Sequence, residues 1–249
     1  MFRRLRRALV RLVLGLVIVS VGAVLVYRFI DPPFTPLMVA RSVETRRAGR
    51  PVGIAKTWVH LDRIAPSLVR SVIVAEDATF FRHAGVDLDA VRRAAVFNAR
   101  HGGRRIRGAG TITMQCARNV FLWQGRSWLR KGLEVWFAWL MELLWGKERI
   151  LEVYLNVVEW GDGVYGAEAA AQRWFAVPAA GLGQREAALL AAALPNPRRS
   201  NPAAPSAYLA DRAAVIQARA VQIRLGRVRA GGAQSPRRSA RAAAIPPAA

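Results

Sequence analysis

The sequence predicts a mostly α-helical protein in which a single N-terminal transmembrane helix precedes one larger domain. Three observations support this prediction. An uncharged apolar run follows an arginine cluster near the N-terminus, apolar residues recur every three or four positions through most of the chain, and alternating strand patterns are almost absent. The length of 249 residues is sufficient for one core and a small appendage.

The transmembrane prediction rests on the N-terminal segment. Residues 1–11 form a basic N-terminus with five arginines, and residues 12–27 carry no charge. A helix of that length spans about 24 Å, and the apolar pair after Arg28 brings it closer to the roughly 30 Å of a bilayer core. Because positive residues stay in the cytoplasm, we expect residues 12–30 to form an uncleaved signal anchor that places the rest of the chain outside. The alternative is a cleaved signal peptide, but the run is long for one and no small-x-small site follows it closely.

The charge balance indicates an anionic partner. The net charge is +22, and lysine contributes only Lys56, Lys131 and Lys147. Nucleic acid, anionic lipid and a phosphorylated substrate all fit such a charge, although an arginine-rich composition can also reflect genome base composition. Export of the domain argues against nucleic acid. Cys116 is the only cysteine, so the chain cannot form an internal disulfide.

The rest of the chain divides into a linker, a helical domain and a tail. Residues 31–56 are proline-rich and predict an extended linker, residues 57–225 the folded domain, and residues 226–249 a disordered basic tail. We expect Ser127 to cap a long apolar helix and Pro195 to end an alanine-rich one. The expected helices begin at Pro66 and cover, further on, residues 87–100, 113–123, 127–145, 147–160 (partly as a loop), 167–175, 185–194 and 208–223.

The stretch LVRSVIVAEDATFFRHAGVD, residues 68–87, breaks two local rules. Val72 and Ile73 belong to an apolar helical stripe, and continuing this stripe by three or four residues leads to Glu76. A carboxylate is disfavoured both on a buried helix face and near the negative end of a helix dipole. We therefore regard Glu76 as a candidate functional residue, with an ion pair to one of the arginines as the simpler alternative.

Several common kinds of site are missing from the sequence. It contains no paired CxxC, HExxH, Walker loop, G-x-S-x-G or S-x-x-K pattern. The stretch GDGVYG, residues 161–166, fits G-x-G-x-x-G, but the preceding residues predict a helix where a dinucleotide site requires a strand. We therefore expect no nucleotide to bind.

What remains is a set of carboxylates and cations. Paired carboxylates suit chemistry at a glycosidic bond, and clustered cations suit a diphosphate leaving group. Lys131 and Glu134 lie three residues apart on one helix, so a solvated ion pair is the simpler interpretation of those two. The candidates are Glu76, Asp77, Arg118, Arg126, Arg130, Lys131 and Glu134.

The order of motifs resembles that of the peptidoglycan glycosyltransferases, which also form one domain of bifunctional penicillin-binding proteins, and most closely that of the monofunctional members. Residues 76–87, EDATFFRHAGVD, match E-D-x-x-F-x-x-H-x-G-x-D at every fixed position. Residues 108–119, GAGTITMQCARN, match most of G-x-S-T-I-[TS]-Q-Q-x-x-[KR]-N. The motifs that follow in order are RKGLE at 130–134, ILEVYLN at 150–156, WGDGVYGAEAAAQRWF at 160–175 and EAALLAAALPNP at 186–197. The resemblance implies a lysozyme-like, two-lobed glycosyltransferase domain whose smaller lobe lies next to the membrane.

The resemblance also implies an activity. Members of this family polymerise lipid II into β-1,4-linked glycan strands with inversion and release undecaprenyl diphosphate. Glu76 matches the general base and Glu134 the second catalytic carboxylate, while Asp77 orients the site and His83 ties its loop in place. The implied substrate-binding residues are Asp77, His83, Thr111, Thr113, Gln115, Arg118, Asn119, Arg126, Arg130 and Lys131.

Partners and a cofactor follow from the same resemblance. The expected partners are lipid II, the growing glycan chain and the bacterial inner membrane, with the catalytic domain in the periplasm and no nucleic acid bound. Because the chain lacks S-x-x-K, cross-linking falls to penicillin-binding or divisome proteins. A divalent cation, Mg²⁺, is expected near Glu134, which either binds it or orders the neighbouring cations.

Two other classes of protein remain as alternatives. A lytic, lysozyme-like enzyme needs one acidic glutamate but has no use for cations around Glu134, and an inactive membrane-anchored scaffold would be expected to lose Glu76 or Glu134. The second motif departs from the family at Gly110 (usually Ser), Met114 (usually Gln) and Cys116 (usually apolar or Thr), so we expect altered substrate contacts there. We expect Cys116 to be a small buried hydrophobe.

A second membrane contact is expected at residues 120–131, VFLWQGRSWLRK. The stretch combines apolar residues, Trp123, Trp128 and cations, as interfacial segments do. A second contact is needed because an extended linker would leave the orientation of the domain free. Packing of these tryptophans in the core is the alternative.

Overall fold

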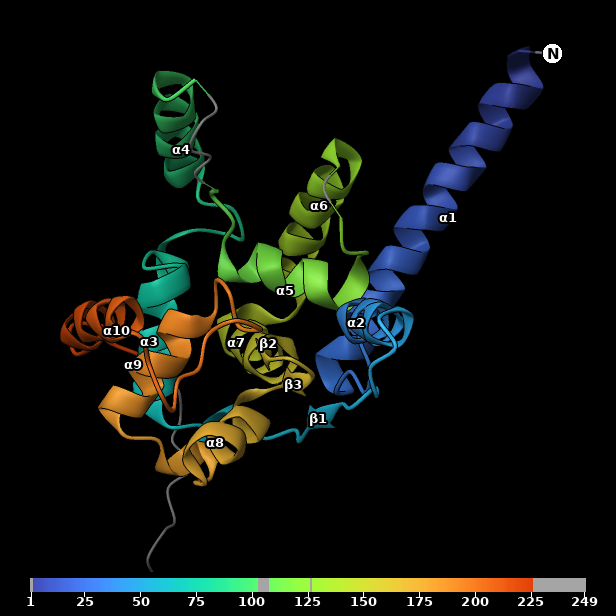
Figure 1. The fold of residues 1–249 in the computed structure, drawn as a ribbon. Coiled ribbons are helices and arrows are strands. Elements are labelled where there is room, and N and C mark those ends of the chain that lie inside the picture. Colours follow the sequence, from blue (N-terminus) through green and yellow to red (C-terminus); the bar gives the residue numbers. More distant parts are fainter. Residues whose placement is uncertain (1, 103–107, 126, 226–249) are drawn as a thin grey trace, which may run out of the picture.

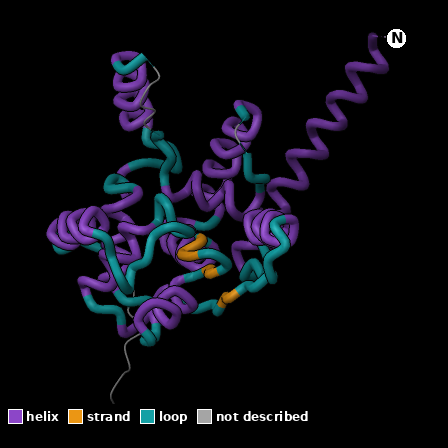
Figure 2. Tube along the Cα trace, in the orientation of Figure 1, coloured by secondary structure: helices purple, strands orange, loops and turns teal. Residues whose placement is uncertain are grey.

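The computed structural model describes residues 2–102, 108–125 and 127–225, and this part of the chain is mostly helical, as predicted (Figure 1). The predicted tail and Arg126 lie outside the described residues. Figure 2 shows that strand is confined to a few short pieces among the helices. The helices are α1 (Phe2–Phe29), α2 (Pro36–Arg47), α3 (Pro66–Glu76), α4 (Leu88–Arg100), α5 (Ile112–Phe121), α6 (Trp128–Leu144), α7 (Gly146–Val157), α8 (Ala167–Phe175), α9 (Gln184–Ala193) and α10 (Ala207–Ala220). Short 3-10 turns occupy Leu61–Arg63, Phe80–Arg82 and Ala179–Gly181.

Helix boundaries follow the local signals in the sequence. Pro66 is at the start of α3, where its missing N–H costs nothing. The Asp87 carboxylate caps α4 by accepting from the N–H of Ala90 at 2.7 Å, and the Ser127 hydroxyl caps α6 by accepting from Arg130 N–H at 3.1 Å. The predicted starts of these three helices are confirmed.

The core lies where α3, α5, α7 and α9 meet. α3, α9 and α10 pack against one another, and α5 packs against both α6 and α7. Along α3, the apolar stripe that leads to Glu76 is fully buried, since Leu68 and Val72 have no exposed surface. The predicted stripe is confirmed, and it fixes the rotation of α3 about its axis.

Helix α1 is long and apolar enough to cross a membrane, and its N-terminal part projects away from the domain (Figure 1). Its C-terminal part is attached to the domain. The indole N–H of Trp136 donates to Ser20 Oγ at 3.1 Å, that of Trp145 donates to Val24 O at 2.6 Å, and Arg149 Nη2 donates to Tyr27 O at 2.9 Å. The expectation that the linker leaves the domain free to reorient is therefore wrong, because α6 and α7 hold the end of α1.

The prediction that residues 31–56 form an extended linker is also wrong. This segment contains α2, which begins at Pro36 behind the Thr35 cap and packs on α5. The helix is polar and has no apolar stripe, so its sequence carried only the capping signal. Arg41 Nε lies 3.1 Å from Glu159 Oε2, and Arg198 Nη1 lies 3.0 Å from Glu44 Oε1, which ties α2 to distant parts of the chain.

A small sheet, missed by the sequence prediction, joins the linker to the segment after α7. β1 (Ala55–Lys56) pairs in parallel with β3 (Val164–Tyr165), and β3 pairs antiparallel with β2 (Glu159–Gly161). These strands are too short to show an alternating pattern. Gly163 has a φ of +75°, and a Cβ there would clash with Gly53 O, so the close approach of the two segments requires glycine.

The segment predicted to touch the membrane is divided between core and surface. Val120 and Leu122 are buried, and Phe121 stacks on Phe137 with 4.7 Å between ring centroids. Trp123 is 47% exposed and Trp128 is 92% exposed. Leu129 is 71% exposed, so among the described residues of the segment it is Trp123, Trp128 and Leu129 whose apolar side chains remain available for a membrane contact.

Candidate active site

Glu76 is the last residue of α3 and is held by a short chain of side chains from two other helices. Gln115 of α5 donates from Nε2 to Glu76 Oε2 at 2.8 Å. Tyr154 of α7, which is fully buried, donates its hydroxyl to Gln115 Oε1 at 3.2 Å. Because Gln115 is bound at both ends of its amide, its N–H is oriented toward the carboxylate. Tyr154 was missed at the sequence level, since nothing local marks it as part of a site.

The surroundings of Glu76 alter its acidity in a way that suits a base. Burial raises the pKa of Glu76, and the hydrogen bond from Gln115 and the charges of Arg212 and Arg118 offset part of this effect. A carboxylate with a raised pKa binds a proton more strongly than a solvated one. The half-buried position still leaves it reachable from one side.

A second group of charges surrounds Glu134 on α6. Arg130 Nη1 is paired with Glu134 Oε1, and Lys131 Nζ lies 3.0 Å from Glu134 Oε2. The Glu134 side chain is only 5% exposed, so this is not the solvated helix pair that spacing alone suggested. Glu134 instead holds two cations in place, one of which, Lys131, remains partly exposed.

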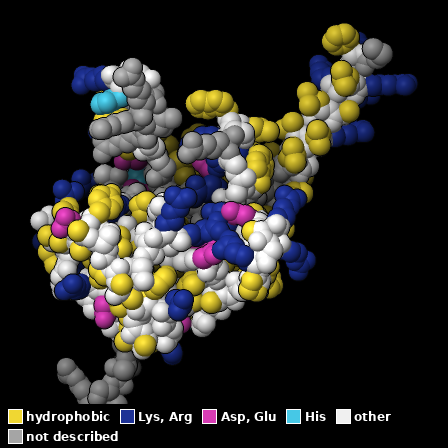
Figure 3. All heavy atoms as spheres, in the orientation of Figure 1, with side chains coloured by type: hydrophobic (Ala, Val, Ile, Leu, Met, Phe, Trp, Pro, Cys, Tyr) yellow, Lys and Arg dark blue, Asp and Glu magenta, His cyan; other side chains and the backbone are white. Residues whose placement is uncertain are grey.

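Arg118 connects the two groups. Burial lowers the pKa of Arg118, and the Glu76 carboxylate opposes that change. The pKa of Lys131 is lowered by burial and then by the nearby charges of Arg118 and Arg130. Arg118 therefore lies within electrostatic range of both Glu76 and the cations of α6. In Figure 3, Lys and Arg side chains gather over the centre of the molecule, with a few acidic side chains among them. Such a surface favours an anion.

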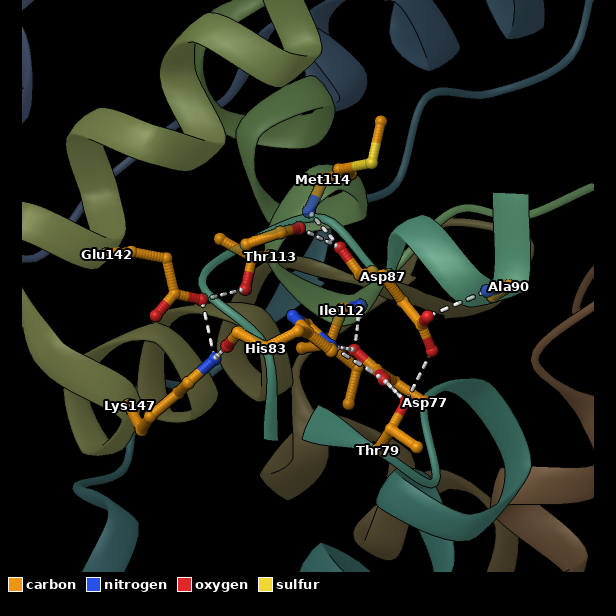
Figure 4. Close-up of polar contacts among 12 residues, drawn as sticks. Asp77, Thr79, His83, Asp87, Ala90, Ile112, Thr113, Met114, Glu142 and Lys147 are labelled. Carbon is orange, nitrogen blue, oxygen red and sulfur yellow. Dashed lines mark hydrogen bonds and ion pairs between the residues drawn. The ribbon is translucent and has the colours of Figure 1, made fainter. Parts of the chain in front are cut away.

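The loop after Glu76 is held by Asp77 (Figure 4). The buried Asp77 carboxylate lies 3.0 Å from His83 Nε2 and accepts from the N–H of Ile112 at 3.1 Å. Asp77 thus connects the end of α3, the loop and the start of α5. The roles expected for Asp77 and His83, orienting the site and tying the loop, agree with this geometry, although both side chains face the protein.

Thr111 and Thr113 also bond within the protein. Thr111 Oγ1 donates to Gly85 O at 2.5 Å and caps α5, and Thr113 Oγ1 donates to Glu142 Oε1 at 2.7 Å (Figure 4). Both residues are buried and support the fold at this point, and the expected substrate contact of each stays a prediction. Lys147 Nζ completes the network by donating to both Glu142 Oε1 and His83 O at 2.7 Å. Glu142 and Lys147 were missed because their partners are distant in sequence.

Known proteins resemble this chain over most of its length. The sequence profile of the family described as "Transglycosylase" matches residues 45–221. The chain belongs to the transglycosylase family. It is 50% identical over 224 residues to a protein of Rhodospirillum centenum, covering 90% of this chain and 94% of that one. It is 51% identical to proteins of Caulobacter vibrioides (84% of this chain, 88% of that one) and Bdellovibrio bacteriovorus (85% and 84%).

All three relatives carry the name biosynthetic peptidoglycan transglycosylase. This chain is therefore a peptidoglycan glycosyltransferase of the monofunctional kind, an enzyme that polymerises glycan strands in cell wall synthesis. The resemblance found in the sequence motifs is confirmed.

Three positions depart from the pattern of the transglycosylase family. Met114 and Cys116 are buried in the core, and burial raises the pKa of the Cys116 thiol, which makes it unreactive. The expectation that Cys116 is a small buried hydrophobe is confirmed. Gly110 has open space where a Cβ would lie, so packing does not require glycine there.

Asn119 and Arg126 are the two remaining residues expected to bind substrate, and the structure describes only Asn119. Asn119 is almost fully buried and accepts a long hydrogen bond of 3.5 Å from Arg118 Nε. It therefore orients Arg118 more directly than it meets a ligand. Arg126 lies outside the described residues.

The site does not fit a resident metal ion. Within the described residues, no group of three or more His, Cys, Asp or Glu side chains is placed to hold one. Both oxygens of Glu134 already face a cation. Mg²⁺ prefers several oxygen ligands in octahedral geometry, which this set of protein donors does not offer.

Proposed function

We propose that this transglycosylase joins disaccharide units of lipid II and that Glu76 is its general base. The observation that supports this role is the half-buried Glu76 carboxylate, which Gln115 orients beside a group of cations. General bases work best with a pKa near the working pH, and burial moves the pKa of Glu76 in that direction.

The proposed step is an inverting displacement. The 4-hydroxyl of the acceptor GlcNAc attacks C1 of the MurNAc at the lipid-linked end of the growing chain, and Glu76 takes the hydroxyl proton. A bond forms between O4 and C1 as the bond from C1 to the diphosphate oxygen breaks. Its electron pair leaves with undecaprenyl diphosphate. Attack on the face opposite the leaving group converts an α-linked diphosphate into a β-1,4 bond.

We assign the leaving group to the cations of α5 and α6. Negative charge grows on the diphosphate oxygens as the bond breaks, and preorganised cations lower the energy of that state. Lys131 and Arg130 are fixed by Glu134, and Arg118 extends the positive charge toward Glu76. Arg126 belongs to the same proposal by its motif position. Cleavage of the bond between the sugar C1 and the diphosphate supplies the driving force, so no nucleotide is needed.

The proposed role of Mg²⁺ depends on the substrate and not on a metal site of the protein. Because the protein donors do not fit a resident ion, we propose that a divalent cation arrives with the substrate diphosphate and that Glu134 is the nearest carboxylate to it. Lys131, Arg130 and Arg118 orient the diphosphate without relying on that ion.

The arrangement of α1 supports a location in the bacterial inner membrane. An arginine-rich start before an apolar helix favours a cytoplasmic N-terminus and a periplasmic catalytic domain. Exposed Trp123 and Trp128 supply a second contact at the membrane surface. Cross-linking of the strands then falls to penicillin-binding or divisome proteins.

The decisive experiment uses the detergent-solubilised protein and labelled lipid II. The wild type should produce polymer that muramidase digests. Glu76→Gln, which is nearly isosteric but cannot accept the proton, should lose about 10²–10⁴-fold in rate. Glu148→Gln makes the same change at an exposed carboxylate and should leave the rate unaltered.

Each competing function predicts a different result in this assay. A lytic enzyme would release anhydro-sugar or new reducing ends from preformed glycan. A scaffold would bind lipid II without consuming it. If Glu76→Gln keeps activity within a few-fold of wild type, another group is the base.

A further inference from the structure

A recess of about 770 Å³ lies beneath α4, and His83 of the loop described above is among the residues that line it. Figure 3 shows the surface hollowed below this helix. Its walls come from the loop that follows Glu76, the first turns of α4 and Trp139 of α6. None of the residues that line it is Glu76, Gln115, Arg118, Lys131 or Glu134. Its volume falls within the range of about 300–1,000 Å³ that is common for small-molecule sites.

The polar side of the recess contains two guanidinium groups with donors to spare. Arg82 forms no ion pair with any residue that the structure describes, and Arg93 reaches Asp87 Oδ2 only at 3.7 Å. The Asp87 carboxylate is already engaged, because it caps α4 and accepts from Thr79 Oγ1 at 2.7 Å. Both guanidinium groups can therefore bind an oxyanion in bidentate fashion.

A second carboxylate lines the recess besides that of Asp87. Asp89 lies in the first turn of α4, lines the recess and forms no ion pair within the described part of the chain. It can accept a hydrogen bond from a hydroxyl or an amine. A ligand with a phosphate and a nearby donor matches this combination better than a simple anion does.

The other side of the recess is apolar and open. Leu88 is 74% exposed and Trp139 is 56% exposed, and both line the recess. Leu143, one turn beyond Trp139 on α6, is 79% exposed. Large apolar side chains that lie together on a surface favour an apolar ligand or a membrane.

The recess lies on the side of the molecule from which the membrane anchor leaves. α4 and the free part of α1 project from the same side of the body in Figure 1. With α1 as the proposed membrane anchor, the base of α4 lies on the side of the domain that faces the bilayer. Phosphate groups and the first methylenes of acyl chains meet at the surface of a bilayer.

We propose that this recess binds one phosphate-bearing membrane lipid. Arg82 and Arg93 bind the phosphate, Asp89 accepts from the hydroxyl or amine of the headgroup, and Trp139 and Leu88 contact the first part of the chain. Phosphatidylglycerol and phosphatidylethanolamine both carry this chemistry, and a polyprenyl phosphate shares its phosphate and apolar chain. This inference goes beyond glycan polymerisation and does not depend on the roles of Glu76 or Glu134.

The test measures lipid binding by the full-length protein in mixed micelles, without lipid II. Phosphatidylglycerol with brominated acyl chains quenches tryptophan on contact, so the part of the quenching that Trp139→Phe abolishes reports the recess. In the wild type this part should saturate. Arg82→Gln with Arg93→Gln should weaken it about tenfold, or about 1.4 kcal/mol.

Matched variants distinguish binding in the recess from general electrostatic attraction of anionic lipid to the protein surface. Arg92→Gln with Arg100→Gln removes the same charge from α4, but neither residue lines the recess, and binding should stay within about twofold of wild type. Arg82→Lys with Arg93→Lys should retain most of the affinity, which would show that loss in the Gln pair is not unfolding. Equal losses in the two Gln pairs, or quenching unaffected by Trp139→Phe, would overturn the proposal.

Competition identifies the source of the lipid. Displacement of phosphatidylglycerol by undecaprenyl phosphate at lower concentration would support the site and assign it to the carrier lipid. Weaker displacement would support it as a phospholipid site. If inorganic phosphate alone displaces the lipid as effectively as either, the recess is a plain anion site and the proposal fails.

Discussion

Replacing Gln115 by Leu tests whether the environment of Glu76 sets the pH dependence of the enzyme. The substitution removes the 2.8 Å hydrogen bond from Gln115 Nε2 to Glu76 Oε2 while keeping a side chain of similar size. This bond favours the charged carboxylate, so its loss raises the pKa of Glu76 further. The base is then protonated, and inactive, over more of the pH range.

The size of the effect follows from the strength of the bond. A hydrogen bond to a charged group contributes about 1.5–3 kcal/mol. The lower end applies, because Glu76 is only half-buried and Arg118 and Arg212 still favour its charged form. Since about 1.4 kcal/mol corresponds to one pH unit, the acid limb of kcat/KM should move upward by about one unit. Below that limb the variant should be about tenfold slower, and the two profiles should converge at high pH.

The assay is a pH series of initial rates with fluorescent lipid II at low concentration, so that kcat/KM is measured. Tyr154→Phe is the matched comparison. It removes the hydroxyl that donates to Gln115 Oε1 at 3.2 Å but leaves the amide in contact with Glu76, so its acid limb should move in the same direction by clearly less. An acid limb that stays in place in Gln115→Leu would refute the assignment of that limb to Glu76.

Three further predictions concern the cations, the loop and the membrane contact. Lys131→Met should lower kcat/KM by about 10²–10³-fold, because it removes a cation held beside the leaving group, and an unchanged value would exclude Lys131 from that role. Gly85→Ala should destabilise the fold by about 1–3 kcal/mol in thermal melts, since Gly85 has a φ of +84° and a Cβ would lie 3.1 Å from Ala138 O. Gly132→Ala on α6, where a Cβ meets nothing within 4 Å, should be neutral or stabilising, and equal losses would contradict the argument. Protein lacking residues 1–30 should still bind anionic vesicles. In that protein Trp123→Ser with Trp128→Ser should weaken the binding, whereas Tyr208→Ser on α10 should not. If the double tryptophan variant unfolds, these two residues belong to the core and not to a membrane contact.

The parts of the site that sequence could predict are those set by local spacing. The apolar stripe of α3 ends on Glu76, the capping residues Asp87 and Ser127 begin α4 and α6, and Lys131 and Glu134 share one face of α6. Each depends on residues within a turn or two of one another. The resemblance to the family motifs then indicated that these separate residues belong to one site.

The parts that sequence could not predict depend on contacts between distant segments. Tyr154 acts through Gln115, which lies 39 residues earlier, and Glu142 accepts from Thr113 across 29 residues. α2 escaped notice because it buries only the adjacent pair Leu37 and Met38, which makes no repeating stripe, and its other long-range contacts are ionic, through Arg41 and Glu44. The burial of Glu134 could not be predicted either. Sequence spacing shows which residues lie beside Glu134 on α6, but not which helices cover it.

The joint between α1 and the domain has a mechanical consequence. Trp136, Trp145 and Arg149 hold α1 at Ser20, Val24 and Tyr27, which are points along about two helical turns. A joint fixed at several points transmits rotation, so a change in the tilt of α1 is also a change in the tilt of the catalytic domain. Helix tilt responds to any difference between apolar length and bilayer thickness. With α1 as the proposed membrane anchor, the acyl-chain length of the surrounding lipids would help to set the angle at which the catalytic domain meets the membrane.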